Sequence, residues 1–171
     1  MAADPRCIRK AVSACLTGGA FLEAIRAIYA AVDCEVESLG VSCDACGRCC
    51  RFDLAGHRLY ASAGELALLS TVAPPEGVRH RRLRCPYQVG PLCAARDVRP
   101  LGCRAFYCGP ETRDRTADIY ERYHAQLRRL HERHSVPYAY AELTESLRGL
   151  PEAPDIAEDE HNGVDSTPSG S

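Results

Sequence analysis

Eight of the eleven cysteines in this chain of 171 residues lie in two short segments. The first cysteine segment reads Cys43-Asp-Ala-Cys46-Gly-Arg-Cys49-Cys50, and the second begins about 35 residues further on, at Cys85. Spacers of two residues let successive thiolates turn toward one point, as the ligands of a metal ion or an iron–sulfur cluster must. We predict that the two segments meet in space and bind metal through eight ligands: Cys43, Cys46, Cys49, Cys50, Cys85, Cys93, Cys103 and Cys108.

The sequence leaves the arrangement of these ligands open. Neighbouring cysteines rarely bind one metal because their side chains point apart. We therefore expect one of Cys49 and Cys50 to join a first centre, while the other faces a second centre or supports the core. Eight cysteines could form two four-thiolate sites, or one cluster with four further cysteines that are structural or redox-active. His57 could complete a mixed Cys/His site.

The metal is also undecided between two classes, because iron–sulfur clusters and zinc or iron ions all accept thiolate ligands. The C-x2-C-x2-C spacing matches the first three ligands of a bacterial ferredoxin-type site, and a Cys-Pro pair follows at Cys85-Pro86. These two features slightly favour an iron–sulfur cluster as the cofactor over zinc or iron ions.

A disulfide framework is the competing interpretation of so many cysteines. The chain begins Met1-Ala-Ala-Asp-Pro-Arg-Cys7, which lacks the basic and then apolar layout of a signal peptide. Eleven is an odd number, and the vicinal pair is awkward for disulfide formation. We therefore expect reduced thiols and a cytoplasmic location.

The two cysteine segments together resemble the YkgJ-like cysteine-cluster family, which is described as carrying a zinc- or iron-chelating domain. The likeness covers residues 43–108 and consists of C-x2-C-G-x-C-C, a helix with Glu65, Cys-Pro-Tyr, and Val-Arg-Pro-Leu-Gly-Cys-Arg-Ala-Phe-Tyr-Cys. It implies metal binding by the eight cysteines and matches Arg99, Pro100 and Arg104 to an R-P-x-x-C-R element. It supplies no reaction. Arg99 and Arg104, which flank Cys103, could stabilise thiolate charge or pair with Glu65 or Asp97.

The elements that must position these cysteines are mostly helical by their apolar periodicity. Residues 5–36 are predicted to form helix, divided at Gly18-Gly19, with this apolar stripe: Phe21, Ile25, Ile28, Val32 and Val36. We expect the remaining cysteines of this region to be small buried hydrophobic residues: Cys7, Cys15 and Cys34.

A second helix is predicted to start at Ser62, where Ser62 and Glu65 have the spacing of a capping box, and to end at Pro74-Pro75. Residues 77–108 are expected to form turns and short extended pieces. A long helix is predicted over 113–134, and a short helix over 138–147. The long helix has the buried stripe Ile119, Tyr123, Leu127 and Leu130, and we expect its histidines, His131 and His134 among them, to face solvent.

These elements predict a mainly α fold, a small helical domain with a loop-rich, metal-organised cysteine core and few or no strands. Its parts are N-terminal helices over 1–40, the cysteine core over 41–110, helices packed on the same domain over 111–150, and a disordered acidic tail over 151–171. No apolar run approaches the roughly 20 residues that cross a bilayer, which predicts no membrane partner. The net charge of −2 argues against nucleic acid.

The function that follows is metal binding through clustered thiolates, in a structural or electron-transfer role. One alternative is a redox or methyl-transfer enzyme using the same centre, because related cysteine-cluster sequences occur in flagellin lysine methylases. Whether the chain is an enzyme stays uncertain, since it has no Gly-rich nucleotide loop after a strand and no evident Ser/His/Asp arrangement. The other alternative is a metal-trafficking protein. The partner, a protein or a redox partner, is not identified by the sequence.

Overall fold

The computed structural model describes residues 4–41, 43, 45–76, 83–107, 110–148 and 150, with the side chains of 110, 111 and 113 left aside. Cys108 and the acidic tail over 151–171 lie outside the described residues. The mainly α prediction is confirmed. The elements, in chain order, are α1 (Pro5–Leu16), α2 (Gly19–Ser38), the 3-10 helix η1 (Arg48–Cys50), α3 (Phe52–Ala55), β1 (Tyr60–Ser62), α4 (Ala63–Leu69), β2 (Gln88–Val89), β3 (Leu92–Cys93), the 3-10 helix η2 (Arg96–Val98), α5 (Leu101–Ala105), α6 (Pro110–Arg133), β4 (Tyr140–Glu142) and α7 (Leu143–Leu147).

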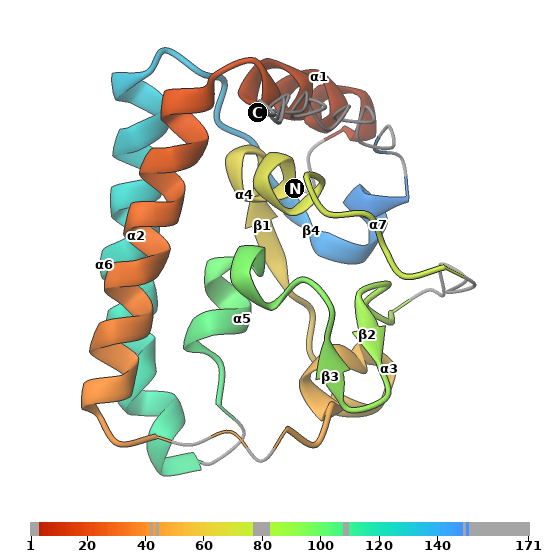
Figure 1. Cartoon of the computed structure of the whole chain (residues 1–171), viewed down its shortest axis with the longest axis vertical. Helices are drawn as coiled ribbons and strands as arrows, with labels where there is room; N and C mark the ends of the chain where they lie inside the picture. Colours follow the sequence, from red (N-terminus) through yellow and green to blue (C-terminus); the bar gives the residue numbers. More distant parts are fainter. Residues whose placement is uncertain are drawn as a thin grey trace, which may run out of the picture.

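The two long helices, α2 and α6, pack side by side along one edge of the molecule and run in opposite directions (Figure 1). The predicted stripe of α6 is buried throughout, and so is that of α2 except at one position. There Tyr29 is buried and Ile28 only partly so, because Tyr29 faces α4 and α5 rather than α6. Apolar burial along these stripes supplies the main stabilising free energy of the helix pair.

Helix α1 crosses the end of α2 at 96° and packs on α4 (Figure 1). Within the described part of the chain, no single helix is both long and apolar enough to span a bilayer, and only α1 and α2 counted together would be. Of the three cysteines expected to be buried in this region, Cys15 is, whereas Cys7 and Cys34 are exposed. That prediction was wrong for those two because they lie outside the apolar stripes of their helices.

The predicted capping box at the start of α4 is confirmed, with Ser62 as the N-cap. The helix ends at Leu69, five residues before the prolines that were expected to end it. The hydroxyl groups of Ser70 and Thr71 donate to the carbonyl oxygens of Ala67 and Leu68, at 2.8 and 2.7 Å. These side-chain hydrogen bonds satisfy the last carbonyls of the helix and compete with its continuation.

Two small antiparallel sheets complete the fold, in agreement with the expectation of few strands. Strand β1 pairs with β4, with Ala61 opposite Ala141, so the helix predicted over 138–147 is a strand followed by the shorter helix α7. Strands β2 and β3 form a hairpin. Gly90 and Pro91 make its turn, and the φ of 56° at Gly90 suits the first central position of a type II′ turn.

One buried carboxyl group joins three helices. Glu65 accepts hydrogen bonds from the backbone N–H and the hydroxyl of Ser62, at 2.7 and 2.8 Å, which completes the cap of α4. Its other oxygen accepts from the N–H of Leu101 at 2.8 Å and from the hydroxyl of Tyr29 at 3.5 Å. Because Pro100 has no side-chain group that can cap α5, Glu65 takes that role from another helix.

The expectation that His131 faces solvent was wrong, because its side chain is only 1% exposed. Its Nδ1 lies 3.1 Å from the carbonyl oxygen of Pro137, and its ring packs edge-on against Phe21. Nε2 is buried without a hydrogen-bond partner, and a Cβ at Gly64 would lie 2.9 Å from it. Glycine at position 64 therefore leaves the space that this histidine fills. Burial lowers the pKa of His131.

Replacing Glu65 by alanine is expected to destabilise the protein by about 3 kcal/mol or more, since it leaves buried N–H groups of Ser62 and Leu101 without an acceptor. Urea unfolding of the Glu65→Ala variant would measure this loss. Glu132→Ala, an exposed change on α6, is the matched control and should stay close to the wild-type value. A Glu65→Ala protein as stable as the control would show that the network contributes nothing.

Stability should fall as the pH drops below 6.5, the ordinary pKa of histidine, because the unfolded chain then binds a proton that buried His131 resists. The loss grows until the pH reaches the lowered pKa of the folded state and is then complete. Unfolding free energies of the wild type and of His131→Leu, measured between pH 7.5 and 5, would test this. The variant should show a shallower decline, and equal slopes for the two proteins would contradict the assignment.

Candidate metal centre

The two cysteine segments do meet in space, as their spacing predicts. The N–H of Cys85 donates to the carbonyl oxygen of Cys50 at 3.0 Å, and the N–H of Asp53 donates to the carbonyl oxygen of Leu83 at 3.1 Å. A bridge between Arg51 and Arg84 lies in the same stretch. Backbone hydrogen bonds thus hold the two segments together.

The first cysteine segment turns sharply at two left-handed residues, Ala45 with a φ of 47° and Gly47 with a φ of 71°. Gly47 is also pressed against the β2–β3 hairpin. Its carbonyl oxygen accepts from the side chain of Gln88 at 2.9 Å, and a Cβ at this position would lie 2.6 Å from that side chain and 3.0 Å from Pro91. The turn therefore requires glycine for its backbone conformation and for its close packing.

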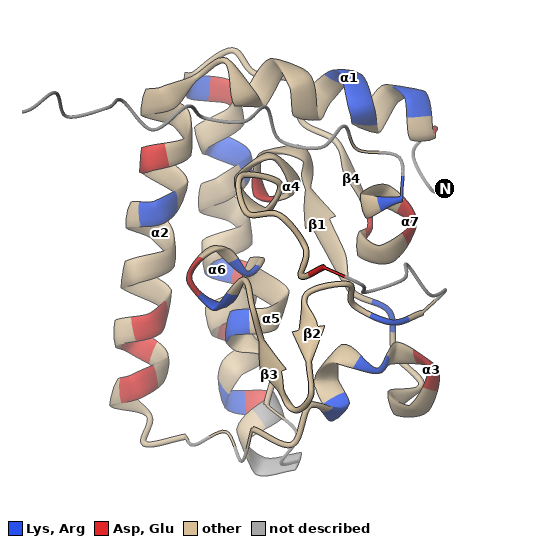
Figure 2. Ribbon diagram, turned by 45° about the vertical axis from the view of Figure 1, so that its right-hand side comes forward, with Lys and Arg blue, Asp and Glu red and all other residues tan. Residues whose placement is uncertain are grey.

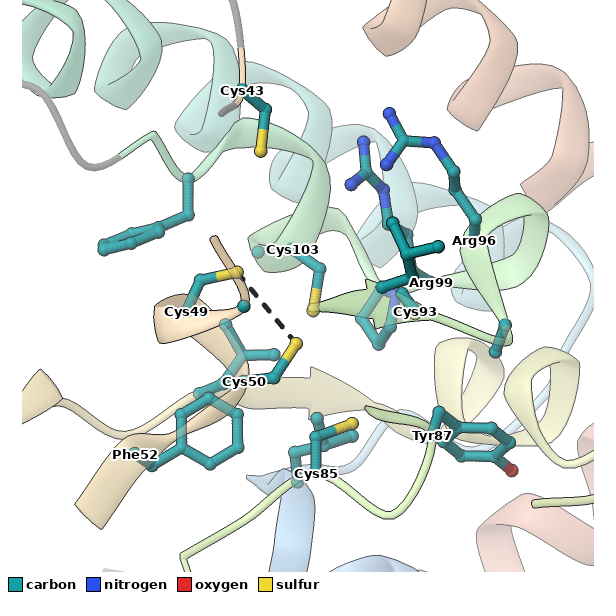
Figure 3. Close-up of a pocket in the computed structure, with 18 of the residues that line it drawn as sticks. Cys43, Cys49, Cys50, Phe52, Cys85, Tyr87, Cys93, Arg96, Arg99 and Cys103 are labelled. Carbon is teal, nitrogen blue, oxygen red and sulfur yellow. Dashed lines mark hydrogen bonds between the residues drawn. The ribbon is translucent and has the colours of Figure 1, made fainter. Parts of the chain in front are cut away.

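Six of the eight predicted ligands line one cavity of about 70 Å³ (Figure 3). They come from the first segment, from the hairpin region and from α5: Cys43, Cys49, Cys50, Cys85, Cys93 and Cys103. Phe52, Leu59, Leu69 and Leu143 form part of its apolar wall. Cys46 is exposed and does not line the cavity, and Cys108 lies outside the described residues.

Cys49 and Cys50 do not diverge as expected. Both line the cavity, and their sulfur atoms lie 4.0 Å apart (Figure 3). The tight winding of η1, which follows Gly47, lets both thiols turn into the same space. With metal–sulfur bonds of about 2.3 Å, two ligands of a tetrahedral zinc site would be roughly 3.8 Å apart. The observed spacing is close to that value.

Three thiols of this cavity have raised pKa values: Cys49, Cys50 and Cys103. The hydrogen bond with Cys50, followed by burial, raises the pKa of Cys49. At Cys50 the hydrogen bond with Cys49 lowers the pKa, but the hydrogen bond with Cys85, burial and the neighbouring thiols outweigh it and raise the pKa to about 12. Burial raises the pKa of Cys103, as do Cys50 and Cys93. Each charged thiolate disfavours the next.

The donor set suits a thiolate-bound metal, although the described residues include no preassembled group of three ligands around one point. Several soft sulfur donors converge on a mostly apolar cavity, which is the environment that zinc, iron and iron–sulfur centres share. A cation would remove the mutual repulsion of the thiolates and draw the sulfurs closer. The cysteines of the cavity therefore fit the group that the sequence predicts.

His57, the proposed additional ligand, also lines the cavity. Its ring is stacked on Phe106, with ring centres 4.8 Å apart, and meets Phe52 edge-on at 5.3 Å. Two aromatic neighbours hold the imidazole in place at the wall. This position leaves a mixed Cys/His site as a prediction.

The two arginines that flank Cys103 differ in role. Arg104 is buried and donates to Asp33 and to the carbonyl oxygens of Asp97 and Arg99, so it pairs with neither predicted carboxyl group. Its guanidinium also lies 4.2 Å from the ring centre of Tyr29. Arg99 lines the cysteine cavity, and its positive charge lowers the pKa of Cys49 and Cys103, against the larger effects that raise them.

Two residues at the site were not predicted from the sequence. Arg96 lines the cavity beside Arg99, and Gln88 fixes the Gly47 turn. Arg96 could have been predicted from its spacing, because it lies three residues before Arg99, just ahead of the start of α5. No local pattern points to Gln88, because its partner is 41 residues away.

Cys15 and Cys7 lie on the same helix but should react very differently with iodoacetamide at pH 8. Burial raises the pKa of Cys15 to about 12, so only about one molecule in ten thousand carries its thiolate at that pH. Mass spectrometry of the reduced, metal-free protein should show rapid labelling of exposed Cys7 and none of Cys15 until urea is added. Equal labelling rates in the native protein would refute the burial of Cys15.

Comparison of the chain with protein-family models, with curated proteins and with solved structures gave no match. The likeness to the YkgJ-like family stays a prediction from the cysteine motifs themselves. The interpretation of the site depends on the cavity and on the residues that line it.

Proposed function

We propose that the protein binds a transition-metal centre through cysteine thiolates of the cavity. The observation that carries this proposal is the convergence of six cysteines from three separate stretches of the chain on one partly apolar cavity. Structural thiols are normally dispersed through a core as single buried residues, as Cys15 is. A group of this size in one cavity is expected where the thiols share a cation.

Within this group, the favoured ligands are the thiols that influence one another most directly. The pKa of Cys50 is shifted by Cys49, Cys85 and Cys93, and the pKa of Cys103 is raised by Cys50 and Cys93, as expected for neighbouring thiols. Cys43 lies at the exposed edge of the cavity (Figure 3). When bound, the metal would supply positive charge and, if it is an iron–sulfur cluster, the capacity to accept and release an electron. Arg99 would offset part of the remaining negative charge.

We propose two alternatives for the metal centre, a single metal ion and an iron–sulfur cluster. The 4.0 Å spacing of the Cys49 and Cys50 sulfurs favours a single tetrahedral ion, because two ligands of one ion lie that close. The ferredoxin-like spacing of the first cysteine segment favours an iron–sulfur cluster. A cavity of about 70 Å³ is several times the volume that one water occupies, so its size is compatible with either.

The role that we propose for the centre is structural or electron-transferring. The backbone hydrogen bonds between the cysteine segments, few in number, support the structural role because metal ligation would add cross-links where the chain has only short elements. A metal-transfer role is the second candidate. Exposed thiols at Cys43 and Cys46, next to the enclosed ones, are what the handover of a metal to a partner protein would use.

Metal analysis of anaerobically purified protein, with a visible spectrum, tests the proposal. Iron with acid-labile sulfide and absorption near 400 nm would identify a cluster, and colourless protein with one or two zinc ions would identify a single-ion site. Cys50→Ser and Cys103→Ser should each lose most of the bound metal. Cys34→Ser, which changes an exposed thiol of α2, should retain it.

The metal content of the variants gives the decisive comparison. If Cys50→Ser and Cys103→Ser keep the full metal content of the wild type, the cavity is not the binding site. If the wild type contains no metal and takes up none from zinc or ferrous iron with sulfide, the proposal itself is wrong.

A further inference from the structure

Two arginines stand side by side where the cysteine cavity opens into a larger groove. Arg96 lies in η2 and Arg99 just after it, and both line the cavity. Both also line a groove of about 580 Å³ bordered by α2, η2 and α5. In Figure 3 the two guanidinium groups lie next to each other, and Cys43, which lines both spaces, is across from them.

Arg99 has a polar group that the protein leaves unsatisfied. Its Nε is buried without a hydrogen-bond partner among the described residues. A buried, charged donor that makes no hydrogen bond destabilises the folded state, so it calls for an explanation. The backbone at Arg99 is held firmly, because its carbonyl oxygen accepts from Arg104 at 2.9 Å and Pro100 follows.

The other charges of the groove are arranged differently. Asp33 is paired with buried Arg104, and Arg26 is paired with Glu23 at 3.3 Å. Among the described residues, neither Arg96 nor Arg99 has a carboxyl group within ion-pair distance. Glu37 and Asp97 also line the groove and would keep an anion away from their own positions.

The charged residues around this point are of both signs. In Figure 2 acidic positions gather on the half of α2 that leads into the first cysteine segment, whereas the segment between β3 and α5 carries basic positions with one acidic position among them. The guanidinium pair supplies positive groups of the groove that have no carboxylate partner among the described residues. Arginine forks bind planar oxyanions through paired, charge-assisted hydrogen bonds.

We propose that Arg96 and Arg99 form a binding site for an oxyanion at the mouth of the cysteine cavity. The ligand is a small molecule that carries a carboxylate or a phosphate group, with its oxygens accepting from the guanidinium groups of Arg99 and Arg96. Because both arginines also line the cavity, the rest of such a ligand would lie against the thiols. The site goes beyond the proposed metal binding and does not require it.

A narrower role for Arg99 would be to neutralise thiolates. That role would act on thiolates that bind metal, whereas binding of an oxyanion requires only the two guanidinium groups at the mouth of the cavity. Oxyanion binding to the reduced, metal-free protein therefore separates the two roles. Oxyanion binding also accounts for Arg96, which is exposed and therefore poorly placed to neutralise buried thiolates.

Isothermal titration calorimetry at low ionic strength, with inorganic phosphate in one arm and malonate in the other, tests the site. Wild-type protein, metal-free and metal-loaded, should bind at least one of the two. Arg99→Gln and Arg96→Gln should each weaken binding by roughly tenfold or more, since each loses a charged hydrogen bond. Arg26→Gln, which removes the same charge from the same groove, should change the affinity by less than about twofold.

Each outcome decides the question. Preference for phosphate or for malonate assigns the ligand class, and binding of both supports the shared oxyanion chemistry. Absence of binding by the metal-free wild type, or an equal loss in Arg26→Gln, would overturn the proposal. Arg96→Gln keeps the test valid if Arg99→Gln fails to fold, because Arg96 is exposed. If no metal is found in any preparation, the calorimetry of the metal-free protein still stands.

Discussion

The position of the cysteine-bearing helix α5 depends on a single buried side chain that belongs to another helix. Glu65 closes the N-terminus of α4 and at the same time accepts from the first N–H of α5, at Leu101. Two helix starts thus share one carboxyl group, and each needs it because orphan N–H groups are costly when they are buried. Cys103 lies two residues further along α5, so its place in the cavity follows from this contact.

The same region is reinforced on the side of α2. Tyr29 donates to Glu65 and lies under the guanidinium of Arg104, which reaches Asp33 on α2 and the carbonyl oxygen of Arg99. Burial and the nearby Glu65 raise the pKa of Tyr29, which therefore stays a hydrogen-bond donor. Polar groups buried at this density rigidify a structure when all are satisfied. Arg99 lies at the edge of this network, and its Nε is not satisfied by it.

The sequence was informative where local rules decide the structure. The capping box at Ser62, the apolar stripe of α6 and the break at Gly18-Gly19 depend on residues within one or two helical turns, and all three predictions are confirmed. His131 was misjudged because its burial depends on Gly64, which is distant in sequence and leaves the necessary space. The helix expected over 138–147 begins only after strand β4, as the shorter helix α7, because Ala141 pairs with distant Ala61.

The candidate site shows the same division. The spacing of the cysteines predicted which residues would gather, and six of the eight do line one cavity. It could not predict that Cys49 and Cys50 turn to the same side, because that depends on the winding of η1. Nor could it predict that Cys46 is exposed, because this depends on the left-handed backbone conformation of its neighbours Ala45 and Gly47. Both outcomes depend on backbone conformation that contact with the β2–β3 hairpin enforces.

That contact has a consequence for how the protein can change over evolutionary time. Gly47 has a positive φ, and a Cβ there would press on the Gln88 side chain and lie 3.0 Å from the backbone of Pro91. A mutation at position 47 would therefore strain the backbone and require both the Gln88 side chain and the hairpin to shift. Such a change is seldom neutral. Divergent descendants of this chain should keep the glycine and the hairpin as one inherited unit, while the exposed loops around them drift.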